Sequence, residues 1–192
     1  MGRRGCWLAR LKIHGRRVTD NRDESDCGHG EASFWECLRE QILAKCDKLS
    51  NMNNRKPILC SACLLGINCR YNGKTKTNDK VLALAKTEIL IPVCPEQLAG
   101  LSTPRDGFGI KNGRSITSGG VDITDKTQLG AEETLKIIKI LGIEKAILKQ
   151  KSPSCGSGQI RDIFSGEIIK GDGVAAALLR KNGIEIISEE EL

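Results

Sequence analysis

The sequence predicts an α/β protein: a single domain with one mostly parallel sheet and helices on both faces of that sheet. From about residue 56 onward, short apolar runs alternate with segments whose apolar residues follow a helical period. The expected strands are apolar throughout, which is typical of parallel strands covered on both faces. With 192 residues, 39% hydrophobic and 28% charged, the chain has the composition of a globular protein with room for one domain and an appendage.

The order of the expected elements is that of a Rossmann-like sheet, in which strands and helices alternate along the chain. The expected strands are 56–62, 88–93, 145–149 and 184–187, and the expected helices are 79–86, 125–141 and 173–181. A hairpin is expected over 160–169, around Ser165-Gly166. Between residues 94 and 120, glycine and proline are too frequent for a regular element, apart from a short helix over 97–101.

Sequence signals also predict where two of the helices begin, where one ends and which side it buries. Thr124 or Asp125 is expected to cap the long helix, Gly142 to end it, and Asp172 to cap the last helix. The apolar residues expected on the buried side of the long helix are Leu129, Ile137, Ile138, Ile140 and Leu141.

The first part of the chain, residues 1–55, is expected to be an extension of the 56–192 domain. Residues 1–51 contain both tryptophans, both histidines and four of the nine cysteines, with little periodicity beyond a helix over 33–49. Our hypothesis is that Met52 is the natural start; the alternative is an accessory segment. His14, His29, Cys27 and Cys37 do not have the spacing of a compact zinc site.

Composition excludes several classes of function. Aromatic residues make up 3% of the chain, too few for a surface that stacks on bases, and the net charge of +6 comes from mixed charges, so no nucleic acid polymer is expected. No apolar run is long enough to span a membrane, and the basic start lacks the apolar stretch of a secretory signal. We therefore expect a cytoplasmic protein whose cysteines are ligands, nucleophiles or core residues rather than disulfides.

Three cysteines follow expected strands at the same edge of the sheet. Cys63 follows the first strand, Cys94 the second, and Cys155 lies in the loop after strand 145–149. The carboxyl ends of parallel strands share one edge, and ligands bind in the crevice outside it. Topology therefore predicts that these three thiols form one site, in loops whose glycines and prolines allow close backbone approach.

Three thiolates leave several chemistries open. Zinc would need a fourth ligand or water, and no histidine follows residue 29, so a Cys/His site in the domain is excluded. A metal-free cysteine nucleophile would need an activating base. An iron–sulfur cluster held by three thiolates would keep one iron open for a substrate.

Two further cysteines lie near this site in the sequence. Cys60 and Cys63 form a CxxC, but residues three apart on a strand point to opposite faces, so we interpret Cys60 as a core residue. Ser61 is expected on the same face as Cys63. We interpret Cys69 as incidental, with an approach to the cysteine site as the alternative.

The second half of the chain resembles the thiouracil desulfidase (TudS-like) family, long catalogued as a domain of unknown function. The resemblance covers about residues 56–190 and is carried, in order, by CSACLLG, RYNGK, LIPVCPEQLAGLSTPRDG, GVDIT, LKQKSPSCGSGQI and GDGVAAALLRKNG. It implies a 4Fe–4S cluster bound by Cys63, Cys94 and Cys155. It also implies non-redox removal of sulfur from a thionucleobase, with release of sulfide.

The resemblance further implies roles for residues around the cluster. Glu96 is expected to be the catalytic acid/base, with Ser152 and Ser154 as catalytic contacts to the substrate or intermediate. Basic side chains are expected to line the crevice, and the residues assigned to substrate binding are Ser61, Arg105 and Lys151, with Arg70 and Lys149 nearby. The alternatives are a cluster-binding sulfur carrier and a structural zinc module.

Overall fold

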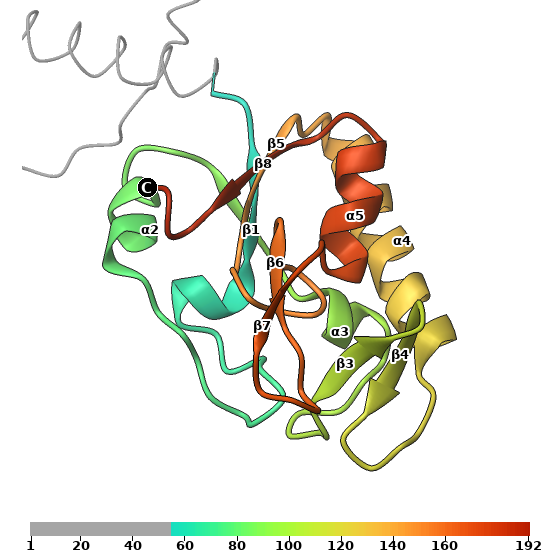
Figure 1. Cartoon of the computed structure of the whole chain (residues 1–192). Coiled ribbons are helices and arrows are strands. Elements are labelled where there is room, and N and C mark those ends of the chain that lie inside the picture. Colours follow the sequence, from blue (N-terminus) through green and yellow to red (C-terminus); the bar gives the residue numbers. More distant parts are fainter. Residues whose placement is uncertain (1–54) are drawn as a thin grey trace, which may run out of the picture. The chain divides into compact units, whose positions relative to one another are not determined.

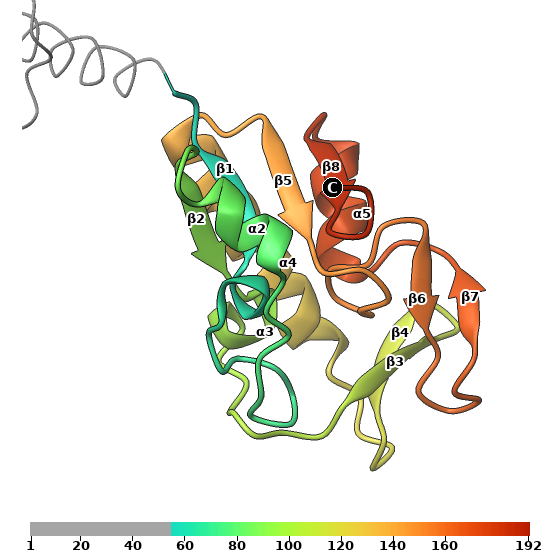
Figure 2. The same cartoon turned by 90° about the vertical axis from the view of Figure 1, so that its left-hand side faces the viewer.

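A four-stranded parallel sheet has the strand order β2-β1-β5-β8. Figure 1 labels β1, β5 and β8, and Figure 2 labels all four strands. The structure, a computed structural model, describes residues 55–192. The strands are β1 (Ile58–Ser61), β2 (Leu90–Val93), β5 (Lys145–Leu148) and β8 (Glu185–Ser188). β1 pairs with β2 and β5, and β5 with β8, all in parallel register. The carboxyl ends of all four strands therefore lie at one edge, as the sequence predicted.

Alternate residues of the central strands enter two separate cores. Leu59, Ala146 and Leu148 pack on one face with residues from α4 (Thr124–Leu141) and α5 (Val174–Lys181). Cys60 and Ile147 pack on the other face with residues from α2 (Asp79–Leu84). Figure 2 shows α2 in front of the sheet with α4 behind it. Helices thus cover both faces, which confirms the predicted α/β class.

The segment 94–120 is more regular than the sequence analysis expected. It contains α3 (Pro95–Leu98) and an antiparallel hairpin of β3 (Phe108–Lys111) and β4 (Arg114–Thr117). The hairpin turns at Asn112-Gly113, where φ is 50° and 74°. Asn-Gly is a strong signal for a two-residue hairpin turn with positive φ, so the prediction of an irregular stretch overlooked it. The second hairpin, β6 (Gln159–Arg161) with β7 (Ile168–Lys170), is as predicted.

The long helix α4 begins and ends close to the predicted bounds but buries only part of the predicted set. Ile138 is buried and Ile137 packs against the core, as predicted. Leu129, Ile140 and Leu141 are exposed, whereas Gly130 and Thr134 are buried. The small residues face inward because α3 and α5 pack closely on α4, which apolar counting alone did not show. Gly142 ends the helix in the left-handed region, as predicted.

The predicted N-caps are wrong for both helices. At α4 the N-cap residue is Ile123, and the Asp122 carboxylate accepts the N–H of Thr124 instead. At α5 the N-cap is Gly173, and Asp172 accepts the N–H of Gly158 in the preceding loop. Asp122 thus satisfies the first amide of α4, whereas Asp172 satisfies a loop amide.

Some predictions concern residues that the structure does not describe. The helix over 33–49, the zinc question and the proposed start at Met52 all lie outside residues 55–192. Of the helices that the structure describes, none has the length and apolar character needed to cross a membrane.

Candidate functional site

A cavity of about 400 Å³ lies at the carboxyl edge of the sheet. Residues after β1, β2 and β5 line it, and the β3 and β6 hairpins contribute Phe108 and Arg161. This is the crevice in which the topology of a parallel sheet places ligands. The predicted cysteines Cys63, Cys94 and Cys155 all line it.

A fourth thiol, that of Cys69, belongs to the same group. Cys69 lines the cavity and is 1% exposed, and its thiol lies within hydrogen-bonding distance of the thiols of Cys63 and Cys94. Cys69 therefore lies at the cysteine site, and its interpretation as a residue unrelated to that site is wrong. The signal lay in the turn over 70–73, where the Gly73 N–H donates to the Arg70 carbonyl and the chain after η1 (Ala62–Leu65) folds back.

Cys60, in contrast, is a core residue, as predicted. It is fully buried in β1 among apolar side chains and does not line the cavity. The reason given for Cys63 is only partly correct, because β1 ends at Ser61 and Cys63 lies in η1. Ser61 and Cys63 both line the cavity, but so does Ala62, and Cys63 packs in the same cluster as Cys60. The expectation that Cys60 and Cys63 point to opposite faces is therefore wrong.

Burial and mutual contact raise the pKa values of three thiols of the cavity, those of Cys69, Cys94 and Cys155. The hydrogen bond with Cys63, with a contribution from burial, raises the pKa of Cys69 to about 11. The contact with Cys69, followed by burial, raises the pKa of Cys94. Burial raises the pKa of Cys155 to about 12, against the effect of hydrogen bonds from Ser61 and Ser154, which lower it. Thiolates are therefore costly here unless a cation stabilises them.

Glu96 lies beside the thiols and is held by an arginine. It is the second residue of α3, follows Cys94 by two residues and lines the cavity. Arg105 Nε donates to Glu96 Oε2 at 2.7 Å, and Arg105 Nη2 donates to the Cys69 carbonyl at 3.0 Å. The arginine and glutamate side chains are 7% and 16% exposed. Arg105 thus fixes the carboxylate and the backbone beside it.

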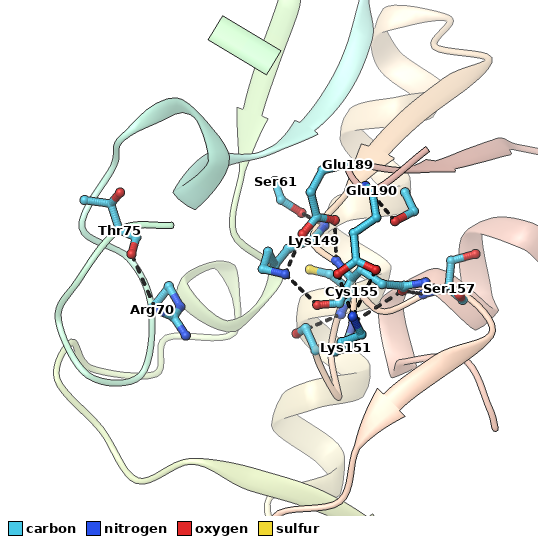
Figure 3. Close-up of polar contacts among 12 residues, drawn as sticks. Ser61, Arg70, Thr75, Lys149, Lys151, Cys155, Ser157, Glu189 and Glu190 are labelled. Carbon is cyan, nitrogen blue, oxygen red and sulfur yellow. Dashed lines mark hydrogen bonds and ion pairs between the residues drawn. The ribbon is translucent and has the colours of Figure 1, made fainter. Parts of the chain in front are cut away.

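The residues after β5 are fixed by the segment that follows β8. Lys149 Nζ and Glu189 Oε1 form an ion pair of 2.5 Å, and Glu189 Oε2 accepts the N–H of Gln150 at 2.6 Å (Figure 3). Glu189 is buried, and the Lys149 side chain is 17% exposed. The Lys149 N–H donates to Ser61 Oγ at 3.0 Å, which ties β5 to the end of β1.

The loop that carries Cys155 is organised by its serines. Ser152 Oγ accepts the N–H groups of Ser154 and Cys155, both at 3.2 Å, and Ser152 lines the cavity. Ser154 is 4% exposed and is not among the cavity residues; its hydroxyl contacts the Cys155 thiol. The two predicted serines therefore have different environments.

The basic residues expected around the crevice are present. Arg70, Arg105, Lys149 and Lys151 all line the cavity. Lys151 has a positive φ of 61° and pairs with Glu190 at 2.7 Å. Sequence reasoning missed Glu189 and Glu190, although both follow β8 and the carboxyl ends of β5 and β8 share one edge.

The donor set suits a group larger than one metal ion. Over residues 55–192, no three Cys, His, Asp or Glu side chains are close enough to hold a single metal ion. Four thiols nevertheless line one cavity with space for several atoms beside a small substrate. Thiolates are the ligands of iron–sulfur clusters, so these residues fit such a cluster. Fold and site define the class: an α/β protein with a thiol-lined cavity at the carboxyl edge of its sheet.

Comparison with known proteins narrows this class to one family. The model of the 2-thiouracil desulfurase family matches residues 58–191. The uncharacterized protein YbbK of Bacillus subtilis (strain 168) is 43% identical over 146 residues, which cover 70% of this chain and 97% of YbbK. The solved structure of the 4Fe–4S-dependent thiouracil desulfidase TudS matches with a TM-score of 0.68 and 39% identity, covering 72% of this chain and 93% of that one. The chain belongs to the 2-thiouracil desulfurase family.

Proposed function

We propose that this protein is a 4Fe–4S-dependent desulfidase that removes sulfur from a small thiolated compound such as thiouracil. The reaction exchanges a thiocarbonyl for a carbonyl: water supplies the oxygen, the sulfur leaves as sulfide, and no electrons are transferred overall. The observation that carries the proposal is the convergence of Cys63, Cys94 and Cys155 on one cavity beside Glu96. Family membership and the likeness to TudS support it.

Cys63, Cys94 and Cys155 are the residues we assign as ligands. They come from three different strand ends, so they surround the cavity, whereas Cys69 is in hydrogen-bonding contact with two of them. When bound, a cluster with three protein ligands supplies an open iron position, a Lewis acid to which the sulfur of the substrate can bind. Binding requires the thiols to lose their protons, which the raised pKa values of Cys94 and Cys155 make dependent on the metal.

Glu96 is the residue we assign to proton transfer. Arg105 donates to Oε2 through both Nε and Nη2, so Oε1 is the oxygen we assign to face water or the substrate ring. A carboxylate held by one guanidinium cannot rotate away, which keeps the proton acceptor at a fixed position. Arg105 therefore acts on the reaction through Glu96.

The substrate itself is assigned to the cavity wall formed by the loop after β5. The Ser152 oxygen already accepts two N–H groups, so its own hydrogen is available to a carbonyl or ring nitrogen of the substrate. Lys151 is the neighbouring cation, with a side chain that is 35% exposed and paired with Glu190. Ser154 supports Cys155 rather than the substrate, because its hydroxyl contacts that thiol.

The decisive experiment is an iron and acid-labile sulfide count after anaerobic purification, followed by incubation with 2-thiouracil. We expect about four irons per chain, visible charge-transfer absorption and sulfide release. Cys63→Ser, Cys94→Ser and Cys155→Ser should each lose the cluster, and Cys60→Ser should keep it as the matched control. A colourless protein with stoichiometric zinc would contradict the proposal. A full cluster without sulfide release from a panel of thiobases and thionucleosides would indicate a sulfur carrier instead.

Cys69 gives a separate test of the ligand set. Because its thiol touches those of Cys63 and Cys94, a Cys69→Ser variant distinguishes three ligands from four. With three, we expect the variant to retain four irons and to release sulfide. Loss of the cluster in Cys69→Ser would place this residue among the ligands and would require a different open position.

A further inference from the structure

Ser61 has a hydroxyl group whose hydrogen is not used by the backbone around it. Ser61 is the last residue of β1, is 2% exposed and lines the cavity. Its oxygen accepts the N–H of Lys149 at 3.0 Å. An oxygen that accepts there can still donate its own hydrogen, and at a buried position that hydrogen needs an acceptor.

The sulfur of Cys155 contacts this hydroxyl. Ser61 lies at the end of β1 and Cys155 in the loop after the neighbouring strand β5, and both face the cavity (Figure 3). Of the assigned ligands, Cys155 is therefore the one that can receive a hydroxyl hydrogen from β1, the strand next to its own.

We propose that Ser61 is a positioning residue that donates its hydroxyl hydrogen to the Cys155 sulfur when that sulfur ligates the cluster. The sequence analysis assigned Ser61 to substrate binding, and the structure favours this other role. A hydrogen bond to a ligating sulfur withdraws electron density from it, which raises the reduction potential of a cluster and slows ligand dissociation. This inference rests on the proposed cluster.

The position of the Ser61 hydroxyl depends on a chain of contacts that ends at Glu189. The Ser61 oxygen accepts the Lys149 N–H, and Glu189 holds this segment through Oε1, which accepts from Lys149 Nζ, and Oε2, which accepts the Gln150 N–H. The Ser61 hydroxyl is thus preorganised by a carboxylate that follows β8, the strand on the opposite side of β5 from β1.

The test is a redox titration of the reconstituted protein, together with the rate at which a chelator removes iron. Ser61→Ala should shift the midpoint potential to a more negative value and release iron roughly tenfold faster than the wild type. Ser61→Thr keeps the hydroxyl and should restore both quantities. Ser115→Ala is the matched control, because Ser115 is also 2% exposed and hydrogen-bonded, to Thr127, but is not a cavity residue.

Each outcome decides between the two proposals. A wild type without iron contradicts the proposed cluster, whereas a loaded Ser61→Ala variant with unchanged potential and release rate overturns the role of Ser61 alone. If Ser115→Ala changes the midpoint potential and the iron release rate equally, the effect is one of general destabilisation, and the role of Ser61 is overturned. If Ser61→Ala holds no iron, Ser61→Thr decides: recovery of iron and of the wild-type potential supports the donor, and failure to recover them rejects it.

Discussion

The residues after β2 and those after β5 both contribute ligands to the cavity, but different forces hold them in place. Cys94 and Glu96 lie at the start of α3, which packs directly on α4 at Gly130. Cys155 lies in a loop whose first residues are tied to the Glu189 carboxylate by an ion pair and a backbone hydrogen bond. The Pro153 and Ser154 carbonyls of the same loop accept the N–H groups of Val174 and Ala175 at the start of α5.

This difference matters because close packing and buried charge respond differently to substitution. A closely packed contact tolerates little added volume, and the stability lost on adding an atom depends on how far the backbone can shift. A buried ion pair adds little by itself, but it becomes very costly when only one partner remains. The segment after β2 should therefore be sensitive to added volume, and the segment after β5 should in addition be sensitive to the loss of a charge.

The largest effect is expected at Glu189. Glu189→Ala leaves the Lys149 ammonium, 17% exposed, without its counter-charge and the Gln150 N–H without its acceptor. The free energy of unfolding should fall by about 3 kcal/mol, the lower end for a broken buried pair. Chemical denaturation measures this, and iron content should fall with it because the Cys155 loop is released.

A double variant separates charge from volume at the same position. Glu189→Leu with Lys149→Met removes both charges, so it should recover a large part of the stability lost in either single variant. If the double variant is as unstable as the sum of the single variants, the ion pair is not what holds this side of the cavity.

The next largest loss of stability is expected at Gly130, where α4 packs against α3, the helix that follows Cys94. A Cβ added there would be 2.9 Å from the carbonyl carbon of Pro95 and 3.1 Å from Ala99 Cβ. Replacing glycine by alanine inside a helix normally stabilises by about 1 kcal/mol. Here the clash should reverse the sign and cost about 2 kcal/mol. Denaturation of Gly130→Ala, with exposed Gln128→Ala in the same helix as control, measures it; a stabilised Gly130→Ala would show that α3 is free to move.

The sequence was sufficient to predict the convergence of the ligands but not what holds them. The positions of Cys63, Cys94 and Cys155 follow from strand order, since parallel strands bring their ends together. Cys69 was not predictable in the same way, because its place depends on a loop that folds back after η1. Loop paths depend on side-chain contacts that no period in the sequence reveals.

Gly130 and Glu189, which hold the two sides of the cavity, also differ in whether they could be predicted from the sequence. Gly130 was hidden because apolar counting favours Leu129 and Ile140, which are exposed, over the small residues that allow close approach. Glu189 could have been found, because it follows β8 and the sheet order places that strand beside β5. Topology thus predicts which ends meet, while the interactions that fix them need coordinates.

The smallest effect is expected at Glu190, the neighbour of Glu189 on the same segment. Its pair with Lys151 has side chains that are 35% and 50% exposed, so water screens it well. Glu190→Gln should change the free energy of unfolding by less than about 1 kcal/mol, while Glu189→Ala changes it several times more. Two adjacent glutamates that each pair with a lysine of one loop would then differ in their burial and in the hydrogen bond that Glu189 accepts from the Gln150 N–H. Comparable losses at both positions would show that the loop is held by its total charge, and that burial of Glu189 is not the property that anchors Cys155.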